Sequence, residues 1–268
     1  MAFTTPHLLY EVRDKVAYLT FNRPEARNAL TRDMYLGICR ACEAVDNDPD
    51  AEVMVIAGSP GAFCAGGDIV EGARFIDSLH ADGASTDAVL FGSSPNAYMP
   101  ADPIRAIQST RKIVVAVVDG ICMGGGFMTA MTADLCVAST NALFAVPEAR
   151  IGVIDAWVAG RLPMYVGMER AKYFILTGRP LPAATAADWG LISAALPRAE
   201  LDAYVASLLS DLLAAAPTAL QAYKLLANQR LPTDEATTAN YAVANAVFRS
   251  PSAREGLTAF RDKRKPIW

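Results

Sequence analysis

A short apolar strand followed by a glycine cluster and then a helical pattern occurs twice in this chain, and this repeat constrains the fold more than any other feature. The clusters are Ala65-Gly66-Gly67-Asp68 and Gly124-Gly125-Gly126. Apolar strands are expected ahead of them at Val53–Ala57 and Ile113–Val118. The order of strand, strand and helix predicts an α/β fold built as successive turns of a spiral, rather than one continuous parallel sheet.

Capping and alternation predict the remaining elements of the first two thirds of the chain. Thr31 can cap a helix that runs to about Asn47, with Asp33 in its first turn. The Gly124-Gly125-Gly126 cluster opens a helix that ends near Thr132. Further short strands are predicted at Leu8–Arg13, Val16–Phe21, Leu135–Ala138 and Leu143–Val146.

From Arg161 onward the pattern is almost wholly helical. We therefore divide the chain into a catalytic core, residues 1–198, and a helical region, residues 199–268. A helical end with Leu, Tyr and Phe on one face needs a partner surface. We expect another subunit to supply that surface, and packing onto the chain's own spiral is the alternative. The clearest helices are Glu200–Ala215, Pro217–Asn228, Asp234–Phe248 and Ser252–Lys263.

The composition excludes several classes of function. Hydrophobic residues make up 53% of the chain and the formal net charge is −4, which gives no general attraction to nucleic acid or to an anionic membrane. The longest apolar segment, Ile113–Val118, falls far short of the ~20 residues that span a bilayer. Without an export signal, five scattered cysteines indicate reduced thiols in the cytoplasm. Two separate histidines predict no metal site, and no dinucleotide-binding glycine motif follows a strand.

The two glycine clusters indicate chemistry as well as structure. Free N–H groups at the start of a helix, together with the positive end of the helix dipole, favour a nearby anion. Glycine also lets the backbone approach a ligand closely. If both clusters converge on one carbonyl oxygen, they form an oxyanion hole. The alternative is that each cluster is only a tight turn.

Together with their surroundings, these clusters resemble the crotonase (enoyl-CoA hydratase/isomerase) family. The resemblance extends over about the whole chain, and its motifs keep the family's order and spacing. The matching strings are Asn22-Arg23-Pro24, Asn28-Ala29-Leu30, Ala62 to Ile69, Val118-Asp119-Gly120, Met123 to Gly126, Phe144 to Glu148, Leu176 to Arg179, Trp189 to Ile192 and the Phe260–Pro266 tail.

The resemblance implies a ββα spiral with a helical C-terminal trimerisation region, assembled as a homotrimer or a dimer of trimers. It implies that the N–H groups of Gly67 and Gly125 are the oxyanion donors. The substrate would be an acyl-CoA thioester, with coenzyme A as part of the substrate and no permanently bound cofactor. The residues that would bind coenzyme A are Arg23, Arg27, Ala65, Asp68 and, in a basic tail whose alternative is a solvated run of charges, Lys263.

The chain departs from the hydratase pattern, in which two glutamates activate a water molecule. It keeps one of them as Glu148, but Met128 stands at the other position, and a thioether cannot transfer protons. An apolar surround that includes Met128, Phe127 and Trp157 would raise the pKa of Glu148. Asp155 falls near the place where hydrolases of the family carry an aspartate. Its alternative role is to cap the following helix.

One glutamate suffices to move a double bond from the β,γ to the α,β position of an enoyl thioester. The sequence therefore favours an enoyl-CoA isomerase. The alternatives, in order, are an enoyl-CoA hydratase, an acyl-CoA hydrolase or decarboxylase that uses Glu148 with Asp155, and a non-catalytic acyl-CoA-binding protein. Gly72–Pro103, the least regular stretch, is expected to cover the site or to be plain surface.

Overall fold

The computed structural model describes residues 5–80, 102–228, 243 and 246–267. The described chain opens with a hairpin of β1 (Leu8–Arg13) and β2 (Val16–Phe21), which pair antiparallel. The turn residues Asp14 and Lys15 both have positive φ, as the tightest hairpin turns require. This confirms the predicted strand pair.

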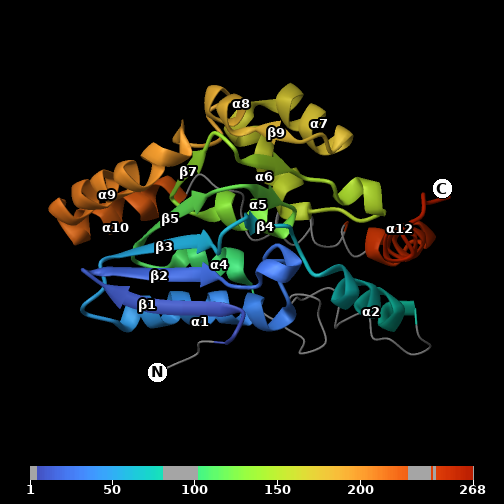
Figure 1. Cartoon of the computed structure of the whole chain (residues 1–268), viewed down its shortest axis with the longest axis horizontal. Helices are drawn as coiled ribbons and strands as arrows, with labels where there is room; N and C mark the ends of the chain where they lie inside the picture. The colour runs from blue at the N-terminus through green and yellow to red at the C-terminus, as the bar shows by residue number, and fades with distance from the viewer. Residues whose placement is uncertain (1–4, 81–101, 229–242, 244–245, 268) are drawn as a thin grey trace.

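After the hairpin, each turn of the chain adds one strand to each of two sheets (Figure 1). The larger sheet has the order β1-β2-β3-β5-β7-β10 and is parallel from β2 onward, while the smaller sheet has the order β4-β6-β8-β9. This arrangement is the predicted ββα spiral. Its strands are β3 (Val53–Gly58), β4 (Ala62–Cys64), β5 (Ile113–Val118), β6 (Ile121–Met123), β7 (Leu135–Ser139), β8 (Leu143–Ala145), β9 (Leu181–Pro182) and β10 (Ala194–Leu196).

The larger sheet is covered on both faces, and alternate residues of β3 divide between them. Met54 and Ile56 belong to the main core, which also contains the buried side chains of α1 (Arg32–Asn47). Val53 and Val55 belong to a second apolar cluster on the opposite face. A strand that is buried on both faces has apolar residues at nearly every position. This pattern predicts β3 and β5 from the sequence.

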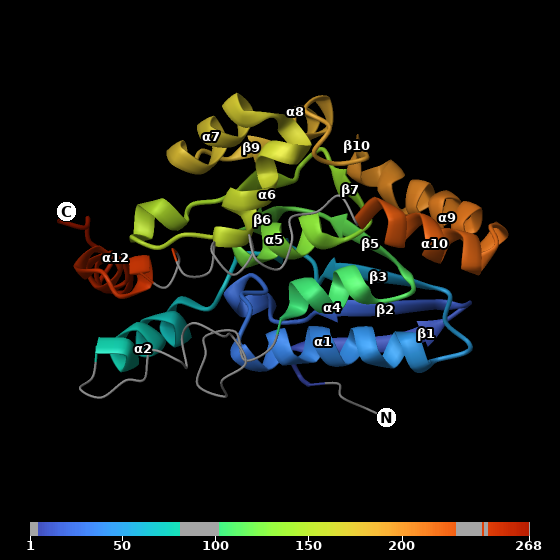
Figure 2. The ribbon, with the colours of Figure 1, turned by 180° about the vertical axis from the view of Figure 1, so that it is seen from behind.

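Helix α1 begins where its cap predicts. The Thr31 hydroxyl accepts a hydrogen bond from the Met34 N–H at 3.3 Å. Figure 2 shows α1 beside α4 (Pro103–Ser109), with which it is in contact. The later helices are α5 (Gly125–Thr132), α6 (Ala156–Val166), α7 (Met168–Thr177) and α8 (Ala183–Asp188), with short 3-10 helices η1 (Pro24–Ala26) and η2 (Glu148–Ile151).

The expectation that Gly72–Pro103 is irregular is wrong for its first part. Helix α2 (Ile69–His80) continues through these residues, because the Asp68 carboxylate accepts hydrogen bonds from the Val70 and Glu71 N–H groups and so caps the helix. Residues 81–101, where the predicted cover would lie, are outside the described part of the chain.

The C-terminal helices pack onto the chain's own spiral, which was the alternative in the sequence analysis. Helix α9 (Arg198–Ala214) contributes Leu209 to the second apolar cluster, and α10 (Pro217–Asn228) contacts β5. Helix α12 (Pro251–Arg261) lies against α2 and η2, away from the larger sheet (Figure 1). Most of the predicted helix Asp234–Phe248 is outside the described residues, and the short strands β9 and β10 interrupt the expected helical run.

None of the described helices has the length and apolar content to cross a membrane alone. Helices α9 and α10 would meet these criteria only together, and they are bent by 104° where they join.

A buried ion pair fastens α10 to the spiral. The Lys224 ammonium lies 2.8 Å from the Asp134 carboxylate and also donates to the backbone carbonyls of Ile107 and Lys112 at 3.0 and 2.9 Å. Asp134 in turn accepts the Val114 N–H at 2.8 Å. The Lys224 side chain is only 4% exposed, so these partners are needed to offset the free-energy cost of burying its charge.

This pair predicts a large effect of a small change. Replacing Lys224 by methionine keeps the packing of the stem but leaves Asp134 buried without its cation. We expect the free energy of unfolding to fall by about 3 kcal/mol. Urea denaturation at a fixed protein concentration measures this loss. Arg13→Ala, which breaks the exposed pair with Glu11, is the control and should cost under about 1 kcal/mol.

Candidate active site

Three segments that carry candidate chemistry leave the smaller sheet at the same edge. Strands β4, β6 and β8 are parallel neighbours. The first glycine cluster follows β4, the second follows β6, and Glu148 follows β8 by three residues. Because the carboxyl ends of parallel strands meet at one edge, residues far apart in the sequence converge there.

The first glycine loop is held in place by the segment that precedes α1. Backbone hydrogen bonds run from the Ala65 N–H to the Arg27 carbonyl (3.0 Å), from the Leu30 N–H to the Gly66 carbonyl (2.8 Å) and from the Asp68 N–H to the Leu30 carbonyl (2.8 Å). Leu30 and Gly67 thereby form a parallel bridge. In this pattern the residues on either side of Gly67 make the bonds, so the Gly67 N–H points away from the bridge.

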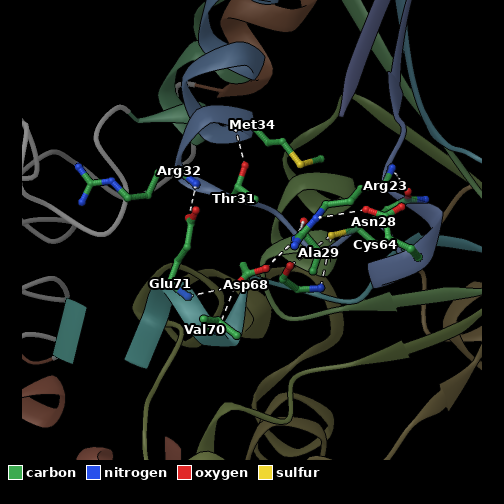
Figure 3. A network of polar contacts seen from close by, with 12 residues as sticks. Arg23, Asn28, Ala29, Thr31, Arg32, Met34, Cys64, Asp68, Val70 and Glu71 are labelled. Carbon is green, nitrogen blue, oxygen red and sulfur yellow. Dashed lines mark hydrogen bonds and ion pairs between the residues drawn. The ribbon is translucent and has the colours of Figure 1, made fainter. Parts of the chain in front are cut away.

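Side chains reinforce the same contact (Figure 3). The Arg23 guanidinium donates to the Asp68 carboxylate at 2.6 Å and to the Ala29 carbonyl at 3.2 Å. The Arg23 contact and the α2 cap together lower the pKa of Asp68, against the opposing effect of burial, which is the largest single influence. Glu71 accepts the Arg32 N–H at 2.7 Å and so joins the start of α1 to α2.

Asn28 belongs to the same network. It is fully buried, and its side-chain oxygen accepts the Arg23 N–H at 2.8 Å. Its amide nitrogen donates to the Ala62 carbonyl at 2.7 Å, at the start of β4. Asn28 has φ of 58°, a left-handed conformation that asparagine tolerates better than most residues.

The two glycine loops converge. A methyl group added at Gly66 would lie 3.2 Å from the Met123 carbonyl oxygen and 3.8 Å from the Gly125 nitrogen. A methyl group added at Gly125 would lie 3.5 Å from the Gly67 nitrogen. Gly125 is the first residue of α5, so its N–H has no intrahelical partner. The backbone nitrogens of Gly67 and Gly125, which come from separate loops, therefore lie close together.

Glu148 lies against the second loop. Its carboxylate oxygen Oε1 occupies the space that a side chain at Gly124 would need. The other oxygen, Oε2, is buried, and it has no hydrogen-bond partner within the described residues. Burial, with a smaller contribution from the nearby Asp155 carboxylate, raises the pKa of Glu148 to about 8.

Asp155 caps the following helix, which was the alternative role in the sequence analysis. Its side chain caps α6 by accepting the Val158 N–H at 2.9 Å. It also lies close enough to Glu148 for the two carboxylates to titrate as a pair. Burial raises the pKa of Asp155, and hydrogen bonds from the Val158 and Trp157 N–H groups oppose that rise. Asp155 therefore stays ionised more readily than Glu148.

The three side chains that were expected around Glu148 are buried in the main core: Met128, Phe127 and Trp157. Met128 lies on α5, one turn after the second glycine loop. Within the described chain, no group of three or more His, Cys, Asp and Glu side chains is placed to hold a metal ion.

The residues predicted to bind coenzyme A lie in three places. Arg23 and Asp68 are paired with each other beneath the first loop, while Arg27 and Ala65 are joined through their backbones at its edge. Lys263 is exposed just beyond α12. In the same tail, Arg264 is engaged by Glu255 through two hydrogen bonds of 2.6 and 3.0 Å.

The sequence analysis missed two neighbours of the glycine loops. Cys64 is fully buried, and its sulfur accepts the Gly66 N–H at 3.3 Å. Tyr35 is also buried, and its hydroxyl lies 2.6 Å from the position of a methyl group added at Gly125. The helical phase of α1 places Tyr35 on the buried face, but nothing in the sequence shows what its hydroxyl contacts.

Comparison with known proteins agrees with this geometry. A family model described as enoyl-CoA hydratase/isomerase matches residues 11–268. The chain is a member of the enoyl-CoA hydratase/isomerase family. It is 33% identical to a crotonyl-CoA hydratase of Syntrophomonas wolfei, over 97% of this chain and 96% of that protein. It is 30% identical to a probable enoyl-CoA hydratase of Mycobacterium bovis, with the same coverage.

Solved structures of the family share the fold. A carnitinyl-CoA dehydratase from Mycobacterium avium superposes with a TM-score of 0.81 at 30% identity, over 98% of this chain and 99% of that one. An enoyl-CoA hydratase from Mycobacterium avium subsp. paratuberculosis gives a TM-score of 0.76 at 30% identity, over 98% of both chains. The crotonase fold and an enzyme of the hydratase/isomerase type, both predicted from the sequence, are confirmed.

The raised pKa of Glu148 has a consequence for stability. The folded protein keeps the proton up to about pH 8, whereas the unfolded chain releases it near the ordinary value of 4.5, so stability falls as the pH rises between these values. Glu148→Gln removes this loss. We expect the variant to be more stable than the parent protein by on the order of 2 kcal/mol at pH 8, with a smaller difference at pH 5. Denaturation curves at the two pH values measure the effect, and an equal difference at both would contradict it.

Proposed function

We propose that this family member is an enoyl-CoA isomerase that moves a β,γ double bond into conjugation with the thioester. One observation supports this proposal above the others. Glu148 is the carboxylate that touches an oxyanion loop, and the position of the second glutamate of hydratases is occupied by the buried Met128. One carboxylate in contact with a glycine loop suits a reaction that takes up and returns one proton.

In this mechanism the Gly67 and Gly125 N–H groups bind the thioester oxygen. Glu148 removes a proton from the α carbon, and negative charge develops on the oxygen as the dienolate forms. The same glutamate, now protonated, returns the proton at the γ carbon. A base with a pKa of about 8 is well matched to this task, because its two forms are close in free energy near neutral pH.

The acyl-CoA thioester is held, in this proposal, by the first loop and the basic tail. The exposed Arg27 and Lys263 side chains supply positive charge for the nucleotide phosphates, which an acidic chain offers only locally. Ala65, Arg23 and Asp68 shape the loop beside the nucleotide. A homotrimer or dimer of trimers, formed through residues 199–268, and a cytoplasmic location remain predictions.

Hydration of a 2-enoyl thioester is the second candidate, and one observation favours it. Asp155 lies close enough to Glu148 to raise its pKa, so the site holds two carboxylates although Met128 replaces the expected one. The names of the relatives, among them a crotonyl-CoA hydratase, agree with this candidate. Asp155 would then share the activation of water with Glu148.

Two variants separate the candidates. Glu148→Gln should lower the isomerisation of a 3-enoyl-CoA by about 100-fold or more, since it keeps the shape of the side chain but removes the base. Asp155→Asn should keep most of the isomerase activity. Because it removes the negative neighbour, it should also shift the rise of kcat/KM with pH toward lower pH.

Steady-state rates with a 3-enoyl-CoA and with crotonyl-CoA measure both effects. If Asp155→Asn abolishes turnover of crotonyl-CoA as fully as Glu148→Gln does, and crotonyl-CoA is the better substrate, the hydratase is correct. If Glu148→Gln keeps full activity with both thioesters, neither mechanism holds.

A further prediction concerns coenzyme A. Arg27→Ala and Lys263→Ala should each weaken binding of an acyl-CoA by about 5- to 10-fold, because a phosphate loses a charged partner. Binding of the matching pantetheine thioester, which lacks the nucleotide phosphates, should not change. Calorimetric titration with both ligands tests this, and equal losses for the two would contradict phosphate recognition.

A further inference from the structure

The Tyr35 hydroxyl lies at the junction of the two glycine loops. Two polar atoms surround the point that a methyl group on Gly125 would occupy: the Tyr35 hydroxyl oxygen at 2.6 Å and the Gly67 nitrogen at 3.5 Å. The third of the three nearest atoms belongs to the apolar Leu30 side chain, at 3.6 Å. A phenolic hydroxyl therefore lies within a few ångströms of both proposed oxyanion donors.

The position of Tyr35 is fixed by the start of α1. Thr31 caps the helix, and Glu71 accepts the Arg32 N–H, so the first turn of α1 is tied to the start of α2, which follows the loop that carries Gly67. Tyr35 follows within the next turn, and its N–H donates to the Thr31 carbonyl at 3.1 Å. Its side chain is 2% exposed. A side chain with so little freedom holds its hydroxyl at a set distance from the glycine loops.

A tyrosine at this position is not required by packing alone. The neighbouring buried positions of α1 are filled by Met34, Ile38 and Ala41, which bring no polar atom into the core. A group that donates a hydrogen bond where negative charge develops is most valuable in a site from which water is excluded.

We propose that the Tyr35 hydroxyl is a third hydrogen-bond donor to the thioester oxygen, beside the Gly67 and Gly125 N–H groups. The inference rests on the proposed oxyanion hole, and it makes Tyr35 a catalytic residue of either candidate reaction. The hydroxyl stabilises the enolate more than the neutral thioester, because a hydrogen bond to an anionic oxygen is roughly twice as strong as one to a neutral oxygen.

The test is Tyr35→Phe, which removes the hydroxyl and keeps the ring. We expect kcat to fall roughly 10- to 100-fold while KM changes little, since the lost interaction is strongest in the transition state. Tyr10→Phe is the matched control. It deletes the same atom from a tyrosine that packs against the same core, on β1, and should leave kcat unchanged.

A spectroscopic measurement separates this role from a structural one. Acetoacetyl-CoA forms an enolate that absorbs in the near ultraviolet, and an oxyanion hole promotes this enolate in the bound ligand. We expect the parent protein and Tyr10→Phe to raise the absorbance, and Tyr35→Phe to require a higher pH for the same enolate fraction.

The outcomes distinguish the role of Tyr35 from the existence of the oxyanion hole. If the parent protein promotes the enolate and Tyr35→Phe does so equally, with unchanged kcat, the role of Tyr35 is overturned and the oxyanion hole stands. If the parent protein binds acetoacetyl-CoA without promoting its enolate, the oxyanion hole itself fails, and the role of Tyr35 fails with it.

Discussion

The parallel contact between residues 27–31 and residues 65–68 is the constraint on which the rest of the site depends. It uses the backbone of both segments, so it fixes the direction of the Gly67 N–H without any side chain at that position. The same contact starts two helices, because Thr31 caps α1 and Asp68 caps α2. Hydrogen bonds of the Asn28 and Arg23 side chains stabilise the contact.

The spiral brings the remaining groups to this contact. Each turn adds one strand to the smaller sheet, so the loops after β4, β6 and β8 are stacked in order at its edge. Glycine is needed where these loops touch, since a side chain at Gly124 would displace the Glu148 carboxylate. Helix α12 supports the same region from outside, because its Gly256 packs against the backbone of Ile151 in the turn that begins with Glu148.

The sequence predicts those parts of the structure that depend on local patterns. Apolar runs buried on both faces identified β3 and β5, and the Thr31 cap identified the start of α1. Properties that depend on distant partners could not be predicted. The buried ion pair of Lys224 with Asp134, the pairing of Arg23 with Asp68 and the placement of the Tyr35 hydroxyl all arise from contacts across the fold.

The position of the second carboxylate determines what it can do. In the hydratase pattern it lies on α5, one turn after the oxyanion glycine, where this chain has Met128. In this chain the second carboxylate is Asp155, which directly precedes α6 and accepts a hydrogen bond from the Val158 N–H. Hydrogen bonds to a carboxylate favour its ionised form, so the proton shared by the pair resides mainly on Glu148. Asp155 is therefore the more readily ionised of the two carboxylates. In the proposed reaction, an ionised Asp155 raises the basicity of Glu148, and we propose that its own hydrogen bond to α6 keeps Asp155 from transferring protons itself.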